Sequence, residues 1–228
     1  MLTVILFRCG LQLVSDEKLL AHPALKRVRL EGRTGTPALL DLGLVHGAVS
    51  DLQLKESGRP DIVHSAIKSV TDTPYWAGHG VKLIIHTIED RVWEIDREWR
   101  VPANYLRFFW LMERFLQEGS LSFADRKMVL REQTAHGLLD EIEQKGGRPA
   151  VFLLSRSGKQ QGLQHLVQLI KKENNPVVIV GCYQRGSAII ELEESLAGKY
   201  QVNSWKIADK GLLTATVLSR LFFGLEFL

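Results

Sequence analysis

The last part of the chain alternates short apolar runs with amphipathic segments, and this alternation constrains the fold more than any other feature. It begins after a Gly-Gly-Arg-Pro break at residues 146–149. The pattern predicts strands at residues 151–154, 177–180 and 200–207, and helices at residues 161–172 and 211–223. Repeated strand and helix units put helices on both faces of a mostly parallel sheet. We therefore expect an α/β fold.

The first half of the chain adds further strands and helices. Residues 2–7 are continuously apolar, as in a strand that is covered on both faces, and residues 81–87 and 91–95 predict a strand pair joined by a tight turn. Helices are expected at residues 46–54, from Pro60 onward, at residues 104–117, and across the charged residues 125–145. At 228 residues and 45% hydrophobic content, the chain can bury the core of one domain with an added lobe.

Composition excludes several classes of protein. The chain has two cysteines, Cys9 and Cys182, with no CxxC motif and no histidine at ligand spacing, so neither a disulfide framework nor a metal site is expected. The apolar residues 2–7 are too few for a signal peptide, and Arg220 and Glu226 interrupt the last apolar stretch, which argues against a membrane span. We expect a protein of the reducing cytoplasm.

A first arginine motif, GRPDIVH, occupies residues 58–64. Pro60 suits the first position of a helix, and it stiffens the backbone beside Arg59. Asp61 can hold the Arg59 guanidinium, accept a proton as a base, or simply complement the helix terminus. The sequence leaves these roles open.

A second arginine motif follows the predicted strand pair. Arg100 precedes Pro102, and Arg107 lies near the start of the helix expected at residues 104–117. Guanidinium groups bind phosphate through two parallel hydrogen bonds, which lysine cannot reproduce. The net charge of +3 adds weak support for a polyanionic partner. Together the two motifs predict a surface that binds RNA.

Loops after the C-terminal strands are the expected ligand site, because ligands in open α/β sheets bind at the carboxyl ends of the strands. The loops are residues 155–158, 181–187 and 207–212. The middle loop has Ser187 where a nucleotide-binding phosphate loop has lysine, and it lacks a GxGxxG pattern. Nucleoside triphosphates and dinucleotides are therefore disfavoured as ligands.

Taken in order, the motifs from about residue 40 to the end resemble the SPOUT-class RNA methyltransferases of the family called nucleolar essential protein or essential for mitotic growth. The motifs that carry the resemblance are Arg59-Pro60-Asp61-Ile62 with His64, Thr71-Asp72-Thr73-Pro74, Ile84-Ile85-His86-Thr87, Arg100-x-Pro102 with Arg107-Phe108 and Leu111-Met112, Val180-Gly181 with Gly186, and Asp209-Lys210-Gly211-Leu212.

This resemblance implies a SPOUT (α/β knot) methyltransferase fold with a C-terminal trefoil knot and an added lobe. It implies one domain over residues 1–228, with RNA-binding insertions and motifs within about residues 41–118 and a cofactor-binding knot over about residues 150–228. The implied activity is S-adenosylmethionine-dependent methylation of N1 of a pseudouridine in small-subunit rRNA during ribosome biogenesis. Implied partners are that rRNA, a second copy of the chain in a homodimer, and ribosomal assembly proteins. The location would be cytoplasmic, or nucleolar in a eukaryote.

The resemblance also assigns residues. Arg59, Arg100 and Arg107 match RNA contacts, and Asp61 matches a position that orients an arginine or acts as a base. Ala103 stands where the family commonly has another arginine, which puts one phosphate contact in doubt. The residues assigned to the cofactor are Leu154, Ser155, Gly181, Gly186, Ile207, Ala208, Asp209, Lys210, Gly211 and Leu212.

Two other functions stay open at this point. A non-catalytic assembly factor could keep the fold and bind RNA while its contribution to ribosome maturation is structural. A SPOUT enzyme could also methylate a different target, such as a ribose or a tRNA base.

Overall fold

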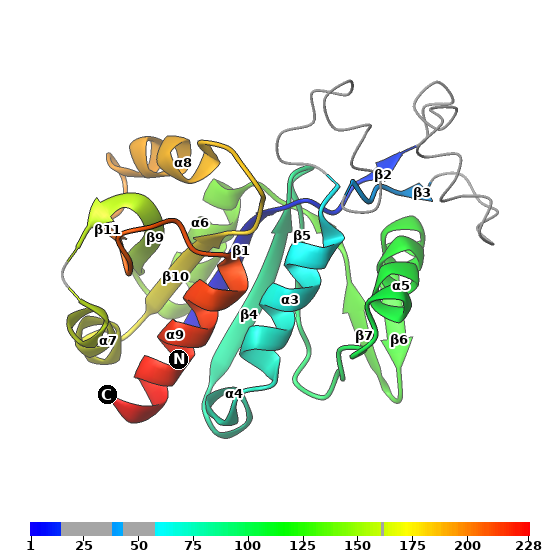
Figure 1. The fold of residues 1–228 in the computed structure, drawn as a ribbon, viewed down its shortest axis with the longest axis horizontal. Coiled ribbons are helices and arrows are strands. Elements are labelled where there is room, and N and C mark those ends of the chain that lie inside the picture. Colours follow the sequence, from blue (N-terminus) through cyan, green and yellow to red (C-terminus); the bar gives the residue numbers. More distant parts are fainter. Residues whose placement is uncertain (15–37, 43–57, 161) are drawn as a thin grey trace.

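The computed structural model describes residues 1–14, 38–42, 58–160 and 162–228, and these form a sheet covered by helices on both faces (Figure 1). The sheet has seven strands in the order β11-β9-β10-β1-β4-β5-β8. Pairings from β11 to β4 are parallel, whereas β5 pairs antiparallel with β4 and with β8. The strands are β1 (Leu2–Cys9), β4 (Val81–Thr87), β5 (Arg91–Glu94), β8 (Arg131–Glu132), β9 (Ala150–Lys159), β10 (Pro176–Gly181) and β11 (Val202–Trp205).

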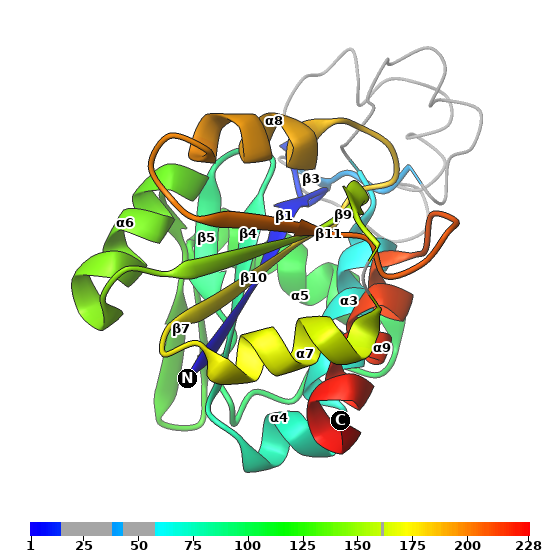
Figure 2. The same cartoon turned by 90° about the vertical axis from the view of Figure 1, so that its left-hand side faces the viewer.

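Helices pack on the two faces of this sheet as the alternating pattern predicts (Figure 2). One face carries α3 (Pro60–Thr71), the short α4 (Pro74–Gly78), α5 (Tyr105–Glu118), α7 (Leu163–Lys172) and α9 (Thr214–Phe227). The other face carries α6 (Ala135–Gly146) and α8 (Ala188–Leu196). Two small two-stranded antiparallel sheets are formed by β2 (Leu13–Val14) with β3 (Ala38–Leu39) and by β6 (Ser120–Phe123) with β7 (Arg126–Val129).

The central strand β1 shows why the sheet needs both layers. Its side chains alternate between the two faces. Val4 and Leu6 belong to the core beneath α3 and α9, whereas Ile5 and Phe7 belong to the core beneath α6 and α8. All four are 0–6% exposed. The strand predicted from the apolar run at residues 2–7 is confirmed.

Helix α5 begins and ends where local chemistry dictates. The Asn104 side chain accepts a hydrogen bond from the Arg107 backbone N–H at 3.1 Å, which is an N-cap, and Gly119 ends the helix with φ 70°. Phe108, Met112 and Phe115 are fully buried. The helix predicted at residues 104–117 is therefore confirmed, with its aromatic side chains in the core.

The helix expected across residues 125–145 is wrong in its first part. Residues 126–129 form strand β7 opposite β6, residues 131–132 form β8, and the helix begins only at Ala135, after Thr134 accepts a hydrogen bond from the Gly137 N–H. Lysine, arginine and glutamate favour helices, but packing overrides that weak preference here. Met128 is 3% exposed while its neighbours in β7 point outward, as the period of a strand requires.

Smaller differences affect the other predicted elements. Strand β9 continues to Lys159, so residues 155–158, expected as a loop, lie within it. Helix α8 was not predicted, although Ala188, Leu192 and Leu196 recur on one buried face. Helix α9 starts later than expected, at Thr214, and continues to Phe227. The helix expected at residues 46–54 lies outside the described residues. Within the described part of the chain, no helix is both long enough and apolar enough to cross a membrane.

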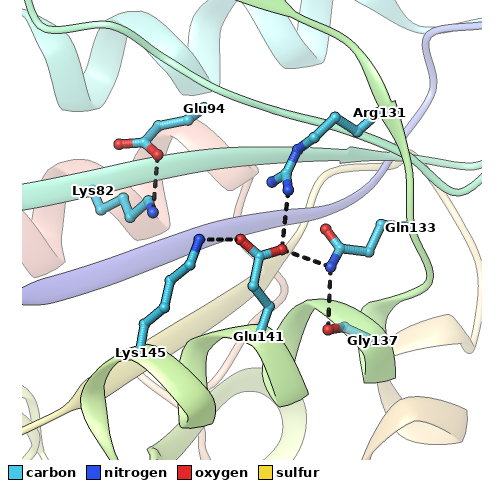
Figure 3. A network of polar contacts seen from close by, with 7 residues as sticks. All are labelled: Lys82, Glu94, Arg131, Gln133, Gly137, Glu141 and Lys145. Atoms are coloured by element: carbon cyan, nitrogen blue, oxygen red, sulfur yellow. Dashed lines mark hydrogen bonds and ion pairs between the residues drawn. The ribbon is translucent and has the colours of Figure 1, made fainter.

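A network of charged and polar side chains connects α6 to the edge strand β8 and the residues that follow it (Figure 3). Glu141 Oε2 accepts hydrogen bonds from Arg131 at 3.0 Å and from Gln133 at 2.8 Å, and its Oε1 accepts from Lys145 at 2.5 Å. These hydrogen bonds lower the pKa of Glu141 to about 2, and the bond from Lys145 has the largest effect. The side chain is 22% exposed, so solvent screens the network only in part.

Replacing Glu141 tests this network through pH. Because the pKa of Glu141 is about 2 in the folded protein, its carboxylate stabilises the fold above the ordinary pKa near 4.5, and this contribution disappears as pH falls through about 2. E141Q should lower the free energy of unfolding by about 1 kcal/mol at neutral pH, and the difference from the parent should vanish near pH 2. Urea unfolding across this range is the measurement, with E194Q on α8 as control. A difference that does not change with pH would contradict the account.

Candidate active site at the carboxyl ends of the parallel strands

The parallel strands bring the ends of distant segments to one edge of the sheet. Leu154 of β9 is in register with Val180 of β10, and Gly181 of β10 is in register with Phe7 of β1. The loop after β10 and the chain after β1 therefore start side by side. The residues expected to bind the cofactor lie at this edge, where open α/β sheets bind ligands.

Side-chain contacts draw the expected cofactor residues together. Thr214, directly after the loop at residues 207–212, donates a hydrogen bond from Oγ1 to the Gly181 carbonyl at 2.8 Å. On the other side of the same loop, a Cβ on Gly211 would lie 3.0 Å from Cδ of Arg156 in β9. Leu154 and Ser155, in the same strand as Arg156, are buried at 8% and 7% exposure. Segments of β9, β10 and the loop before α9 thus form one cluster.

Tyr183 holds the middle loop in a folded position. A side chain on Gly181 would approach the Tyr183 ring to within 2.9 Å, so glycine permits the ring to fold back over the strand end. The Tyr183 hydroxyl accepts a hydrogen bond from the Ile189 N–H at 3.0 Å, in the first turn of α8. Gly186 lies in the exposed part of this loop.

The loops keep backbone donors available. Among the hydrogen bonds of the described residues, none uses the backbone N–H groups of residues 184–187 or 207–213. This second segment contains Ile207, Ala208, Asp209, Lys210, Gly211 and Leu212, all intermediate in exposure or exposed. Unpaired backbone groups at a strand edge suit a ligand held by main-chain hydrogen bonds. This donor set fits the predicted S-adenosylmethionine site, which was expected to have no side-chain signature.

Strands β9 and β11 approach unusually closely below this cluster. A Cβ on Gly158 would lie 2.5 Å from the backbone N and C atoms of Trp205, closer than real atoms pack. The pairing of β11 with β9 shifts register at the same place, where Trp205 pairs with Lys159. Gly158 is therefore required by the backbone approach.

Substituting Gly158 tests this close approach. G158A should lower the free energy of unfolding by about 1–3 kcal/mol or more, because the added methyl group meets backbone that cannot rotate away. Chemical denaturation measures the loss, and G198A is the matched control, since a Cβ on Gly198 meets nothing within 4 Å. Equal stability of the two variants would show that β11 lies farther from β9 than described.

Arg59 and Asp61 form a two-pronged pair at the start of α3. Arg59 Nε donates to Asp61 Oδ1 at 2.8 Å, and its Nη2 donates to Oδ2 at 2.7 Å. This pairing is the main cause that raises the pKa of Arg59, and the nearby Asp41 and Tyr105 add to it. Since both carboxylate oxygens of Asp61 are occupied, the geometry favours orientation of Arg59 over general-base catalysis.

Pro102 anchors the second arginine motif to α3. The His64 imidazole hydrogen-bonds the Pro102 carbonyl through Nε2 at 2.7 Å, and its ring stacks on Phe108. Arg100 lies two residues before this anchor, and Arg107 lies in the first turn of α5. Both are exposed. All the arginines expected to contact RNA therefore surround the junction of α3 and α5.

This junction meets the cofactor loops through β1. The Arg59 backbone N–H donates to the Gly10 carbonyl at 3.1 Å, and the Cys182 N–H donates to the Phe7 carbonyl at 2.8 Å. Both bonds hold the chain at the carboxyl end of the same strand, three residues apart. The start of the Arg59 motif and the loop that follows Gly181 are therefore neighbours in one subunit.

Several residues near this edge have no role assigned by the sequence analysis. Tyr105 donates a hydrogen bond from its hydroxyl to the buried Asp41, and this pair supports the Arg59 side of the site. Cys9 and Cys182 are both buried and free, and burial, followed by a hydrogen bond with Cys182, raises the pKa of Cys9. Burial also lowers the pKa of His86, against the opposing effect of Asp90.

No clear metal site exists among the residues that the structure describes, because they contain no cluster of three or more His, Cys, Asp or Glu side chains that could hold an ion.

Comparison with known proteins identifies the family. The sequence profile of the EMG1/NEP1 methyltransferase family matches residues 4–226. The chain belongs to the EMG1/NEP1 methyltransferase family. A ribosomal RNA small subunit methyltransferase Nep1 from Staphylothermus marinus is 30% identical over 231 residues, covering 100% of this chain and 96% of the relative. A ribosomal RNA small subunit methyltransferase Nep1 from Saccharolobus solfataricus is 28% identical, and the alignment covers 97% of this chain and 94% of the relative.

Solved structures support the same fold for this EMG1/NEP1 chain. The crystal structure of Archaeoglobus fulgidus Nep1 bound to S-adenosylhomocysteine matches with a TM-score of 0.78, covering 98% of this chain and 96% of that one, at 24% identity. The SPOUT methyltransferase fold class expected from the motifs is confirmed.

Proposed function

We propose that this chain transfers a methyl group from S-adenosylmethionine to N1 of a pseudouridine in small-subunit rRNA, with the N1 proton released to water. The observation that carries the proposal is the neighbouring position of the Arg59 motif and the Gly181 loop at the end of β1. Relatives named as ribosomal RNA small subunit methyltransferases, and a similar structure that holds S-adenosylhomocysteine, support the same reading.

The loop backbone would hold the cofactor. The binding residues would be Leu154, Ser155, Gly181, Gly186 and residues 207–212. Among these, Gly186 and residues 207–212 have backbone N–H groups that no hydrogen bond among the described residues uses. When bound, S-adenosylmethionine supplies an electrophilic methyl group. The protein contributes by holding the acceptor nitrogen in line with that group, and such positioning can lower a barrier by roughly 7 to 11 kcal/mol in favourable cases.

The arginines would hold the RNA. Arg59, kept in place by Asp61, and the exposed Arg100 and Arg107 bind phosphates without reading the sequence. The target base must leave its stack to reach the loops, which costs little in a hairpin or single strand. Asp61 is the carboxylate that contacts Arg59 directly, and its two bonds to that guanidinium favour the orienting role. A homodimer would add a second copy of this surface.

Two alternatives remain to be separated from this proposal. An assembly factor without catalysis would keep the arginines and the fold, and the alanine at position 103 leaves room for it. A different acceptor, such as a ribose or a tRNA base, would use the same cofactor site.

Methyl transfer to paired RNA substrates tests the chemistry. With tritiated S-adenosylmethionine and two hairpins that differ only in pseudouridine or uridine, we expect label on the pseudouridine hairpin alone, because uridine has carbon where pseudouridine has N1. Label on neither hairpin would favour the assembly factor, and equal label on both would show a different acceptor atom.

Removing Arg100 tests the RNA surface separately. R100A should weaken RNA binding about tenfold, and it should flatten the dependence of log affinity on log salt by about one unit, because one phosphate contact is lost. Fluorescence anisotropy at several salt concentrations measures both. R148A is the control, since Arg148 is also exposed but lies directly before β9, at the amino end of the parallel strands. If R100A and R148A behave alike, Arg100 does not contact RNA.

A further inference from the structure

The outer face of α5 exposes one tryptophan. Trp110 is 50% exposed, whereas the other tryptophans of the chain, Trp76, Trp93, Trp99 and Trp205, are 1–7% exposed. Leaving half of a large ring exposed to water forgoes part of the stabilisation that burial gives the others. A single exposed apolar side chain needs no explanation by itself, so its neighbours decide what it means.

Helix geometry places Trp110 against the second arginine motif. Residues three and four apart lie on the same face of a helix, so Trp110 adjoins Arg107 and Leu106, and Leu106 is 43% exposed. Side chains on a helix lean toward its N-terminus. The indole therefore lies over the turn that carries Arg107. We call Leu106, Arg107 and Trp110 the outer face of α5.

Two exposed guanidinium groups lie on or near the outer face of α5, those of Arg107 and Arg100. In the described part of the chain, neither Arg107 nor Arg100 has an ion-pair partner. The acidic residues of α5 are engaged elsewhere. Glu118 pairs with Arg114 at 2.8 Å, and Glu113 accepts a hydrogen bond from the Leu39 N–H at 2.8 Å. A flat aromatic ring thus lies beside a guanidinium group that has no anion.

We propose that the outer face of α5 binds single-stranded RNA, with a base stacked on the Trp110 indole and the adjoining phosphate on Arg107. Both parts of a nucleotide are matched: every base has a π face that an indole can cover, and the phosphate complements the arginine. An acidic peptide would satisfy the charge but would leave the ring without a planar partner. This inference rests on the proposed function, because it extends the RNA surface of the same site.

The position of α5 indicates the path that a bound RNA strand would follow. The helix starts at Tyr105, which hydrogen-bonds Asp41 on the Arg59 side of the site, and Trp110 lies more than a turn farther along. RNA held at Arg59 would therefore continue across Arg107 to Trp110. The stack would hold a nucleotide next to the target and not the target base itself.

Binding measurements separate stacking from charge. We would titrate a fluorescein-labelled RNA hairpin carrying a short single-stranded tail with the parent, W110A, W110L, W110F and R107A. W110A and W110L should weaken binding by roughly 5- to 150-fold with an unchanged salt dependence. W110F keeps an aromatic face and should recover most of the affinity. R107A should flatten the salt dependence by about one unit.

Tryptophan fluorescence gives an independent readout, because only Trp110 is well exposed among the tryptophans. In the parent protein, unlabelled RNA should protect part of the emission from quenching by acrylamide. In W110F the same RNA should have no effect on quenching. Because Trp110 is half exposed and phenylalanine keeps an aromatic ring, W110F should unfold in urea at nearly the same midpoint as the parent, and this control shows that a change in binding or quenching is not caused by loss of the fold.

The outcomes distinguish this inference from the proposed function. If W110A binds RNA like the parent while R107A and R100A bind it weakly, the RNA surface stands and the stack is wrong. If W110A changes the oligomeric state in sedimentation and leaves RNA affinity unchanged, the outer face of α5 is a contact between copies of this chain. If the parent itself binds no RNA, both the proposed function and the inference fail.

Discussion

The parallel pairing of β1 with β10 is the constraint on which the rest of the structure depends. It sets Phe7 opposite Gly181, so the chain leaving β1 and the loop leaving β10 begin at the same level. Arg59 is then held at Gly10, just beyond β1, and Thr214 is held at the Gly181 carbonyl. Segments from the two ends of the sequence thus meet at one edge. The two-sided burial of β1 fixes this register, because a shift by one residue would exchange its two buried faces.

Much of this arrangement could be predicted from the sequence. The apolar run of β1, the strand and helix alternation after residue 149, and the helix that begins at Pro60 all carry local signals, namely continuous burial, period and proline position. The arginine motifs could also be recognised, since proline and arginine at fixed spacing do not depend on distant contacts. The bidentate contact between Arg59 and Asp61 is within two residues, so it is local as well. The trefoil knot and the homodimer stay predictions from the family resemblance.

What could not be predicted depends on contacts between distant segments. The charged stretch before Ala135 reads as helix because its side chains are long, and only the burial of Met128 against the rest of the protein makes β7 a strand. β9 continues through Ser155 and Gly158 because Trp205 lies against it, which no local pattern reveals. Asp41 and Tyr105 are 64 positions apart, and neither belongs to a motif. The exposed Trp110 was likewise hidden, since an aromatic in an amphipathic helix is normally expected to face the core.

The central claim is that backbone donors near the C-terminus and arginines from the first half form one site within a subunit. The most direct measurement is a crystal structure of the protein with S-adenosylhomocysteine and a pseudouridine hairpin. We predict the cofactor product on the backbone of residues 184–187 and 207–213, N1 of an unstacked pseudouridine facing its sulfur, and phosphates on Arg59 and Arg100. RNA bound on another face, with its target base far from Gly181, would contradict the account.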